Sequence, residues 1–319
     1  MRILMTGATG FIGSALTKRL LDDGHKISIL TRNKKNVPSI FKRPHVDIFE
    51  WENMHELPPS ECLKEISGVI NLMGENLAAK RWTSEQKKKL ADSRILSTLN
   101  LCTLLDQTIK EPLDFFISAS AIGIYPANRS ETLNEESSLE NNFLANLCKE
   151  WESAAHSLKK TKRTVIIRTA VVLEKNGGAL AKMLTPFKLG IGGTLGNGKQ
   201  FMSWIHLDDL VNLYTAAATD SSYSGVYNGC APNPVDNLHF TKALGQALHK
   251  PTMLNVPKFI LKLGLGEMST ILLDSQKVIS KRLEGHNFTF RFATIESAMK
   301  KIFQRTGDTP SINYSPAAR

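Results

Sequence analysis

The chain has 319 residues, of which 42% are hydrophobic and 22% charged, and its net charge is +10. This length suits one large domain or two unequal ones. The sequence contains no run of about 18 apolar residues, so we predict no membrane span. The positive charge favours anionic small molecules, but no aromatic residues are interleaved with it as in nucleic-acid-binding modules, so we expect no nucleic-acid partner.

The cysteines point to a reducing compartment. They lack the CxxC spacing of metal or redox sites, and no secretory signal precedes the first strand. We therefore predict buried free thiols, no metal site and a cytoplasmic protein without a membrane anchor. The four are Cys62, Cys102, Cys148 and Cys230.

The first thirteen residues join a short apolar strand to a glycine turn and a helix. Residues 3–5 are apolar, Gly7, Gly10 and Gly13 follow, and an amphipathic helical pattern begins at once. A helix N-terminus presents backbone N–H groups and a positive dipole end to a phosphate. The spacing predicts a dinucleotide site, with an ordinary glycine turn as the alternative. The residues expected to hold the cofactor here are Gly7, Thr9, Gly10, Phe11, Ile12 and Gly13.

The second predicted strand, residues 26–30, indicates which dinucleotide binds. In such a fold an acidic residue after this strand favours NAD, whereas arginine suits the 2′-phosphate of NADP. Arg32 follows the strand, Lys34 and Lys35 are close by, and no carboxylate occurs before Asp47. The cofactor is therefore predicted to be NADP rather than NAD. The alternative is that Arg32 is a surface charge without this role.

Further strands are predicted at residues 46–49, 68–72, 115–117 and 164–168, with helices after Thr83 and over 141–159. This alternation predicts an α/β fold with a doubly wound, Rossmann-type parallel sheet. Side chains after the fourth strand are then expected at the cofactor. They are Leu72, Gly74 and Glu75.

The composition changes after residue 170, where several glycine-rich loops suggest a lid or cap over a ligand. We predict a Rossmann domain over 1–170, to which 200–230 returns. A smaller C-terminal, substrate-side domain is expected from 171–199 and 231–305, and 306–319 is expected to be a flexible tail.

These motifs together resemble the extended short-chain dehydrogenase/reductase superfamily. More narrowly, they resemble its "epimerase family" branch, described as NAD(P)-dependent nucleoside-diphosphate-sugar epimerases with a C-terminal domain of unknown function. The resemblance implies an NADP-binding Rossmann domain, a small-molecule substrate and a homodimer, and it adds Ser118 and Arg168 to the expected cofactor contacts. It rests on residues 6–13, 71–75, 81–83, 93–95, 118–120, 168–173, 198–200 and 203–209, with 266–267 and 285–288 in the tail.

The superfamily's proton donor is missing. The resemblance implies that active members use a serine together with a Tyr-x-x-x-Lys pair on the next helix. The tyrosine is the acid/base group, and the lysine lowers its pKa. Ser120 matches the serine, but Leu144 stands at the tyrosine position and Cys148 at the lysine position. The remaining catalytic candidates are Ser120, Tyr125 and His206. For Tyr125 and His206, a purely structural role is the alternative.

Two functions follow from this sequence. The first is an NADP-dependent oxidoreductase or epimerase that acts on an unidentified small, nucleotide-sugar-like molecule with an atypical active site. The second is a non-catalytic NADP(H)-binding sensor or scaffold, since some plastid proteins that the chain resembles are associated with division.

Overall fold

The computed structural model describes residues 1–42 and 44–304, so the predicted tail at 306–319 lies outside the described residues. The chain divides into two compact units. The first comprises Met1–Ile124, Leu139–Arg168 and Val211–Tyr227. The second comprises Tyr125–Ser138, Thr169–Leu210 and the described residues from Asn228 onward.

These bounds differ from the predicted domains in two places, both of which have a visible cause. Residues 204–206 form β10 (Trp204–His206), which pairs in parallel with β7 (Val171–Glu174) of the second unit. Residues 125–138 join the same unit, where Leu133 forms a bridge with Val278. Only Val211–Tyr227 therefore returns to the first unit.

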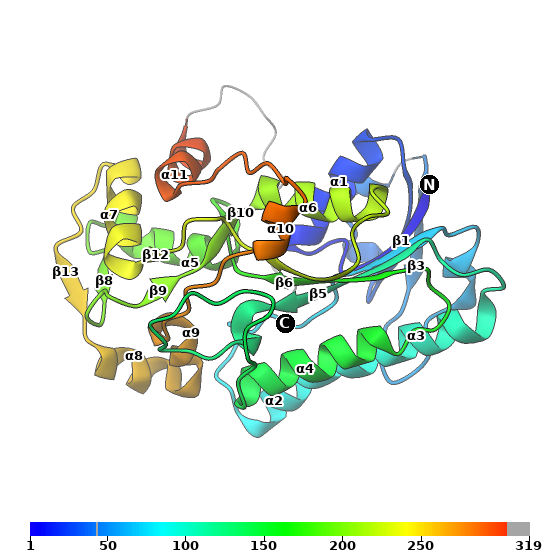
Figure 1. Cartoon of the computed structure of the whole chain (residues 1–319), viewed down its shortest axis with the longest axis horizontal. Coiled ribbons are helices and arrows are strands. Elements are labelled where there is room, and N and C mark those ends of the chain that lie inside the picture. The colour runs from blue at the N-terminus through cyan, green and yellow to red at the C-terminus, as the bar shows by residue number, and fades with distance from the viewer. Residues whose placement is uncertain (43, 305–319) are drawn as a thin grey trace. The chain divides into compact units, whose positions relative to one another are not determined.

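The first unit contains a seven-stranded sheet, which confirms the predicted Rossmann-like α/β fold (Figure 1). Its strand order is β11-β6-β5-β4-β1-β2-β3. The order reverses beside β1, so the carboxyl ends of β1 and β4 flank the point where such folds bind ligands. The strands are β1 (Arg2–Thr6), β2 (Lys26–Thr31), β3 (Val46–Glu50), β4 (Gly68–Asn71), β5 (Phe115–Ala121), β6 (Thr164–Thr169) and β11 (Gly225–Gly229).

Helices cover both faces of this sheet, with α3 and α4 on one face and α1 and α6 on the other (Figure 1). The central strands are fully buried because both faces are covered, which explains their unbroken apolar runs. The helices are α1 (Phe11–Asp22), α2 (Ser84–Ala91), α3 (Ser97–Thr108), α4 (Phe143–His156) and α6 (Leu207–Thr219).

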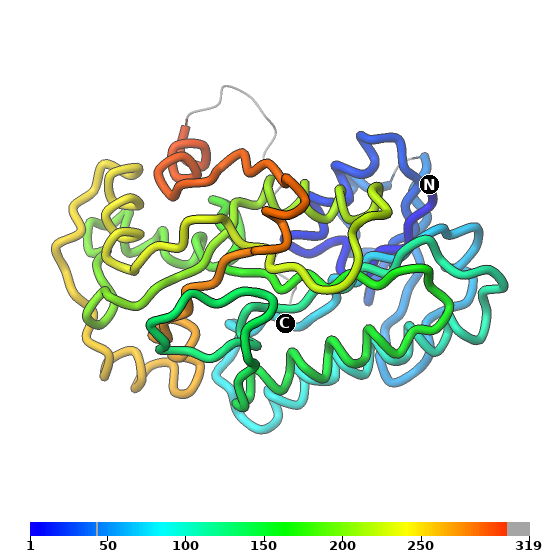
Figure 2. The backbone as a smooth tube through the Cα atoms, in the orientation of Figure 1, coloured from blue at the N-terminus to red at the C-terminus, as the bar shows by residue number. Residues whose placement is uncertain are grey.

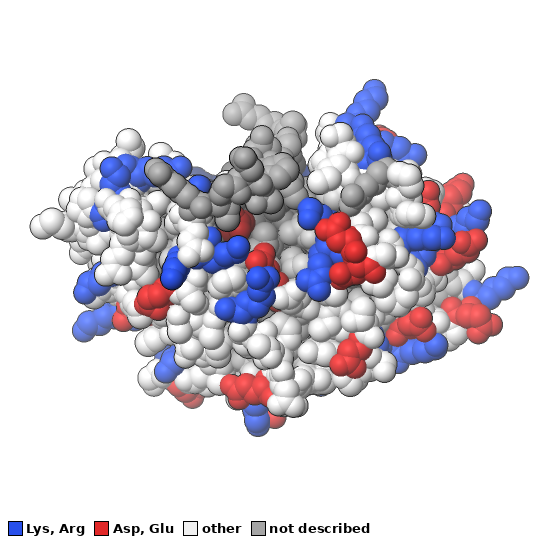
Figure 3. Space-filling view, turned by 90° about the horizontal axis from the view of Figure 1, so that it is seen from above, with Lys and Arg blue, Asp and Glu red and all other residues white. Residues whose placement is uncertain are grey.

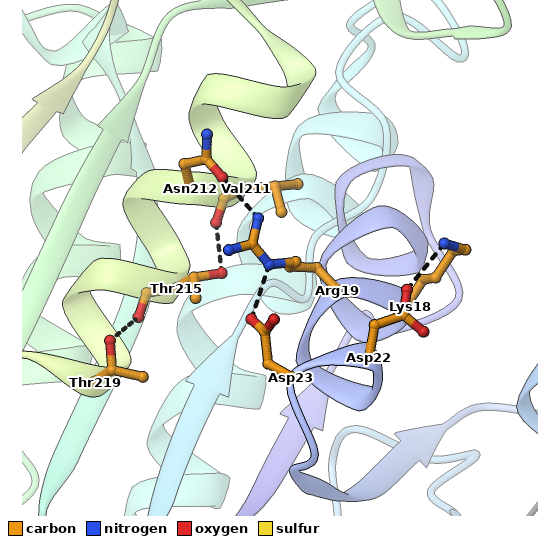
Figure 4. Close-up of polar contacts among 8 residues, drawn as sticks. All are labelled: Lys18, Arg19, Asp22, Asp23, Val211, Asn212, Thr215 and Thr219. Carbon is orange, nitrogen blue, oxygen red and sulfur yellow. Dashed lines mark hydrogen bonds and ion pairs between the residues drawn. The ribbon is translucent and has the colours of Figure 1, made fainter. Parts of the chain in front are cut away.

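Polar contacts join the last turn of α1 to α6 (Figure 4). The Arg19 guanidinium donates from Nε to Asp23, at 2.8 Å, and from Nη1 to Asn212, at 2.9 Å. On α6, the Thr215 and Thr219 hydroxyls donate to carbonyl oxygens one turn earlier, each at 2.9 Å. Exposed bonds of this kind stabilise a fold only modestly. The α1–α6 side of the sheet is thereby fixed without involving the glycine turn at the other end of α1.

The second unit is built from short strand pairs and helices (Figure 1), and Figure 2 traces the path of its backbone. Besides β7 with β10, β9 (Phe201–Met202) pairs with β12 (Val235–Asp236), and β8 (Gly193–Leu195) pairs with β13 (Leu254–Val256). Trp204, Phe240 and Met299 lie in its apolar core. The helices are α5 (Gly178–Lys188), α7 (Asn237–Leu248), α8 (Lys258–Leu265), α9 (Thr270–Leu273), α10 (Lys281–Gly285) and α11 (Ile295–Phe303).

Candidate dinucleotide site

The glycine turn between β1 and α1 requires glycine for steric reasons. Gly7 has φ +64°, and a Cβ on it would lie 2.6 Å from the Leu72 carbonyl oxygen. A Cβ on Gly13 would lie 2.0 Å from the Gly7 carbonyl oxygen. No side chain caps α1 at Gly10, and its first turn contains no acidic residue. The positive end of α1 is thus open to an anion.

The other predicted residues of this turn are all at least partly exposed. Gly10 is exposed, whereas Thr9, Phe11 and Ile12 are half-buried. Leu72 follows β4, and its N–H donates to the Thr6 carbonyl and hydroxyl oxygens at 3.3 and 3.1 Å. The structure thereby brings the predicted residues after β1 and β4 together at one edge of the sheet.

A buried polar network holds the ends of β1, β4 and β5 in register. The Thr6 hydroxyl donates to Asn71 Oδ1 at 2.6 Å. The Asn71 amide donates to the Thr98 hydroxyl at 2.9 Å and to the Ser118 hydroxyl at 3.3 Å. All four side chains are fully buried, so the hydrogen bonds offset the cost of removing them from water. The predicted residue Ser118 therefore has a partner beneath the site.

Arg32 extends from the end of β2 into solvent, with 59% of its side chain exposed. Its nearest acidic partner is Glu75, whose Oε2 lies 3.9 Å from Arg32 Nη1. The next turn is stabilised by a hydrogen bond that does not involve Arg32: the Asn33 side chain accepts from the Lys35 N–H at 2.8 Å. A long, exposed ion pair of this kind is weak. The guanidinium is thus free to turn toward a phosphate.

Two residues that sequence reasoning left without a role clamp the loop after β4. Ser93 and Arg94 lie in a π-helical turn, Asp92–Leu96, between α2 and α3. The Ser93 hydroxyl accepts from the Glu75 N–H at 2.9 Å, and Arg94 donates to the Glu75 carbonyl oxygen at 2.8 Å. Gly74 lies against them: a Cβ there would lie 3.0 Å from Arg94 Cζ, so the guanidinium would have to move by a few tenths of an ångström. Such π turns occur often at functional sites.

Ser120, at the end of β5, joins a buried ion pair. Its hydroxyl donates to Glu152 Oε1 at 2.6 Å. The Arg168 guanidinium donates to both Glu152 oxygens, each at 2.8 Å. All three residues are at least 90% buried. This pairing gives Arg168 the role of orienting Glu152, and its contact with a cofactor stays a prediction.

One face of α4 carries the positions at which the superfamily's tyrosine and lysine are expected. Leu144, Cys148 and Glu152 are spaced four residues apart, which places them on the same face. Leu144 lies 3.6 Å from the position of a Cβ on Gly123. Burial, and then the Glu152 charge, raise the pKa of the Cys148 thiol to about 11. At neutral pH this face therefore presents the apolar Leu144 side chain and the uncharged Cys148 thiol at the positions where active superfamily members are expected to have tyrosine and lysine.

Tyr125 belongs to the second unit and is fully buried. Its hydroxyl donates to Asn228 Oδ1 at 2.9 Å, and its carbonyl oxygen accepts from Gln276 at 2.7 Å. These contacts support the structural alternative for Tyr125, and a catalytic role stays a prediction.

His206 also belongs to the second unit and caps α6. Its Nδ1 accepts from the Asp208 N–H at 3.0 Å, which requires the neutral ring, and its ring lies 4.1 Å from that of Phe292. Burial lowers the pKa of His206 to about 4. The ring is 2% exposed, so the geometry supports the structural alternative here as well.

The lowered pKa of His206 predicts a pH dependence of stability. Between pH 6.5 and about 4 the unfolded chain protonates this residue while the folded chain does not, so the free energy of unfolding falls as pH falls. The loss reaches about 3 kcal/mol near pH 4. His206→Gln keeps a hydrogen-bond acceptor but does not titrate. We expect the free energy of unfolding of this variant, measured with urea at pH 7 and pH 4.5, to lack the fall that His206 causes. Identical pH dependence in the two proteins would contradict this.

Comparison with known proteins decides the family. Residues 3–229 match the NAD dependent epimerase/dehydratase family, and residues 256–302 match a domain of unknown function, DUF1731. The chain belongs to the NAD dependent epimerase/dehydratase family. This confirms the resemblance that the sequence motifs indicated.

Relatives in this family align over nearly the whole chain. The chloroplastic Epimerase family protein SDR39U1 homolog of Arabidopsis thaliana is 40% identical, with 95% of this chain and 87% of that protein covered. Epimerase family protein YfhF of Bacillus subtilis is 35% identical, with 95% and 99% covered. The chain therefore shares both the Rossmann part and the C-terminal part of these proteins.

Solved structures of other proteins resemble this chain over nearly its whole length. The human epimerase family protein SDR39U1 (isoform 2), crystallised with NADPH, is 31% identical with a TM-score of 0.85, covering 96% of this chain and 100% of that chain. A UDP-glucuronic acid 4-epimerase from Bacillus cereus is 18% identical with a TM-score of 0.76, covering 95% and 98%. The second likeness shows the fold alone.

Two further findings bear on binding partners. Among residues 1–42 and 44–304, no helix is long and apolar enough to cross a membrane. The same residues contain no group of three or more His, Cys, Asp or Glu side chains placed to hold a metal ion.

Proposed function

We propose that this protein binds NADP(H) at the edge of the first unit's sheet, as a short-chain dehydrogenase/reductase-like oxidoreductase or epimerase of a small molecule. The open, uncapped glycine turn at α1, in which a Cβ on Gly7 or Gly13 would strike backbone, is the observation that carries the proposal. A pyrophosphate fits such a turn because N–H groups and the helix dipole stabilise its charge. The NADPH-bound human relative supports the choice of cofactor.

The proposed cofactor contacts follow the strand order. Gly7, Thr9, Gly10, Phe11, Ile12 and Gly13 hold the pyrophosphate, and Arg32 holds the 2′-phosphate. Leu72, Gly74 and Glu75 follow β4, and Ser118 and Arg168 complete the predicted set. When bound, the dinucleotide supplies or accepts the hydride.

Ser120 is the proposed contact to the substrate. Because its hydroxyl proton is directed to the Glu152 carboxylate, its oxygen is left to accept a hydrogen bond, as from a substrate hydroxyl. The Arg168 guanidinium holds Glu152 in position for that arrangement through two hydrogen bonds. Leu144, which lies against Gly123, has no group that could move a proton.

Arg32→Ala tests the choice of NADP over NAD. We expect NADPH affinity to fall about 10- to 100-fold, since a charge-assisted hydrogen bond contributes about 1.5–3 kcal/mol. NADH affinity should stay unchanged, because NADH has no 2′-phosphate. Fluorescence titration with each nucleotide measures both values, and Lys34→Ala is the matched control for a neighbouring surface charge. An equal loss for both nucleotides would contradict the role of Arg32.

A non-catalytic NADP(H)-binding sensor or scaffold is the second candidate. Leu144 and Cys148 favour it, because neither side chain can replace the Tyr-x-x-x-Lys chemistry. Partner capture that depends on the nucleotide state would support it.

Turnover separates the two candidates. The enzyme predicts a change in NADPH absorbance with a carbonyl compound or a nucleotide sugar, and a loss of that activity in Ser120→Ala. Full activity in Ser120→Ala would remove the serine from the mechanism. Turnover at enzymatic rates would remove the purely non-catalytic alternative.

The remaining expectations are also proposals. They are a small-molecule substrate on the side of the second unit, a homodimer, a cytoplasmic location and no nucleic-acid partner. On the face in Figure 3, Asp and Glu side chains lie among the Lys and Arg side chains, as suits a protein without one broad nucleic-acid-binding patch. One relative is named chloroplastic.

A further inference from the structure

Arg94 is a buried cation without an acidic partner. It is 8% exposed, and its guanidinium donates to the carbonyl oxygens of Leu90, at 3.2 Å, and Glu75, at 2.8 Å. It also contacts the Ser93 hydroxyl and lies 5.2 Å from the centre of the Trp151 ring. Within residues 1–42 and 44–304, it forms no ion pair. Arginine stays charged at neutral pH even though burial lowers its pKa.

Among the described residues, no acidic group near Arg94 forms an ion pair with it. Glu152 is matched by Arg168 through two hydrogen bonds. The Glu75 carboxylate is one-third exposed and lies 3.9 Å from Arg32, and its charge favours the charged form of Arg94 without forming an ion pair with it. Cys148, whose charge state is coupled to Arg94, is an uncharged thiol at neutral pH. The buried cluster therefore has a net charge of one positive unit, centred on Arg94.

This cation lies where the proposed cofactor would place its nicotinamide. Arg94 is against Gly74 in the loop after β4, and Cys148 lies beside Ser120 at the end of β5. If the glycine turn holds the pyrophosphate and Ser120 contacts the substrate, as proposed, Arg94 would be among the residues beside the reactive ring.

The two redox states of the cofactor differ in charge at this ring. The oxidised nicotinamide carries a positive charge, whereas the reduced ring is neutral, and the phosphates are identical. A buried cation within about 10 Å of the ring disfavours the oxidised form by about tenfold or more at protein-like dielectric. We propose that Arg94 makes this site bind reduced NADPH more tightly than oxidised NADP⁺, an inference that rests on the proposed function.

The experiment measures the ratio of the NADP⁺ and NADPH dissociation constants by calorimetric titration of the full chain. We expect a ratio of at least about ten for the unmodified protein. Arg94→Lys keeps the charge and should keep most of the ratio, whereas Arg94→Met removes the charge and should bring the ratio close to one. Arg94→Gln replaces Arg94→Met if the latter does not fold.

Ser93→Ala is the matched control for a merely structural role. It removes the acceptor for the Glu75 N–H without changing any charge, so it should weaken both nucleotides equally and leave the ratio intact. A ratio near one in the unmodified protein, or an unchanged ratio in the neutral Arg94 variants, overturns the inference. Failure of both nucleotides to bind would instead overturn the proposed function itself.

Discussion

Replacing Gly13 with alanine is expected to weaken NADPH binding by about a hundredfold or more. The new Cβ would lie 2.0 Å from the Gly7 carbonyl oxygen and 2.9 Å from the Ala8 Cα. Both are backbone atoms, so no side chain can move aside. Helix α1 must shift away from the turn, and the N–H groups that face the pyrophosphate shift with it. Overpacking of this kind also costs about 1–3 kcal/mol of stability.

Fluorescence titration with NADPH, together with urea unfolding, measures both effects. Gly264→Ala is the control, because nothing lies within 4 Å of a Cβ at that position. It should leave NADPH affinity unchanged and should not lower the free energy of unfolding, because alanine favours a helix over glycine. Gly10→Ala separates binding from folding, since its Cβ would meet only the Gly7 oxygen, at 3.2 Å, on the open side of the turn. Unchanged NADPH affinity in Gly13→Ala would place the cofactor elsewhere.

Glu152→Ala is expected to lower the free energy of unfolding by about 3–5 kcal/mol, because it leaves the Arg168 guanidinium buried without a counter-charge. The same change removes the acceptor of the Ser120 hydroxyl. Joint replacement, Glu152→Met with Arg168→Met, should cost much less than the sum of the single changes, because no charge is then stranded.

Urea unfolding of the single and double variants measures this coupling. Glu85→Ala is the control, since it breaks the exposed Glu85–Lys89 pair and should have no measurable effect. If Glu152→Ala behaved like Glu85→Ala, the buried pair would not hold Ser120 in place.

Local sequence patterns were sufficient to predict much of the first unit. The apolar runs of β1 and β4 and the glycine spacing follow from burial and from backbone sterics, which act over a few residues. The superfamily resemblance indicated Leu144 and Cys148 as the two motif positions, and helix spacing predicts that they share one face of α4, because residues four apart do so.

Contacts between distant segments were not predictable in the same way. The helix after Thr83 was expected to be continuous, but a π-helical turn at Asp92–Leu96 separates α2 from α3. That turn places Ser93 and Arg94 on Glu75, eighteen residues earlier in the case of Ser93. Residues 93–95 belong to the motifs that carry the superfamily resemblance, and this was the available signal. Their burial and their contacts with Glu75 appear only in the structure.

Arg168 and His206 show the same limit. The resemblance implied a cofactor contact for Arg168, and His206 was a catalytic candidate. The partners that the structure gives them depend on packing: Glu152 on α4 for the first, and the Asp208 N–H with the Phe292 ring for the second. Whether a polar side chain faces a ligand or an internal partner is decided by the tertiary fold, which sequence spacing does not encode.

A crystal structure of this protein with NADPH tests the central claim most directly. The pyrophosphate should lie at the N-terminus of α1 against Gly10–Gly13, with the 2′-phosphate at Arg32 and the nicotinamide beside Gly74 and Ser120. Nucleotide density at another edge of the sheet, or a 2′-phosphate away from Arg32, would contradict it.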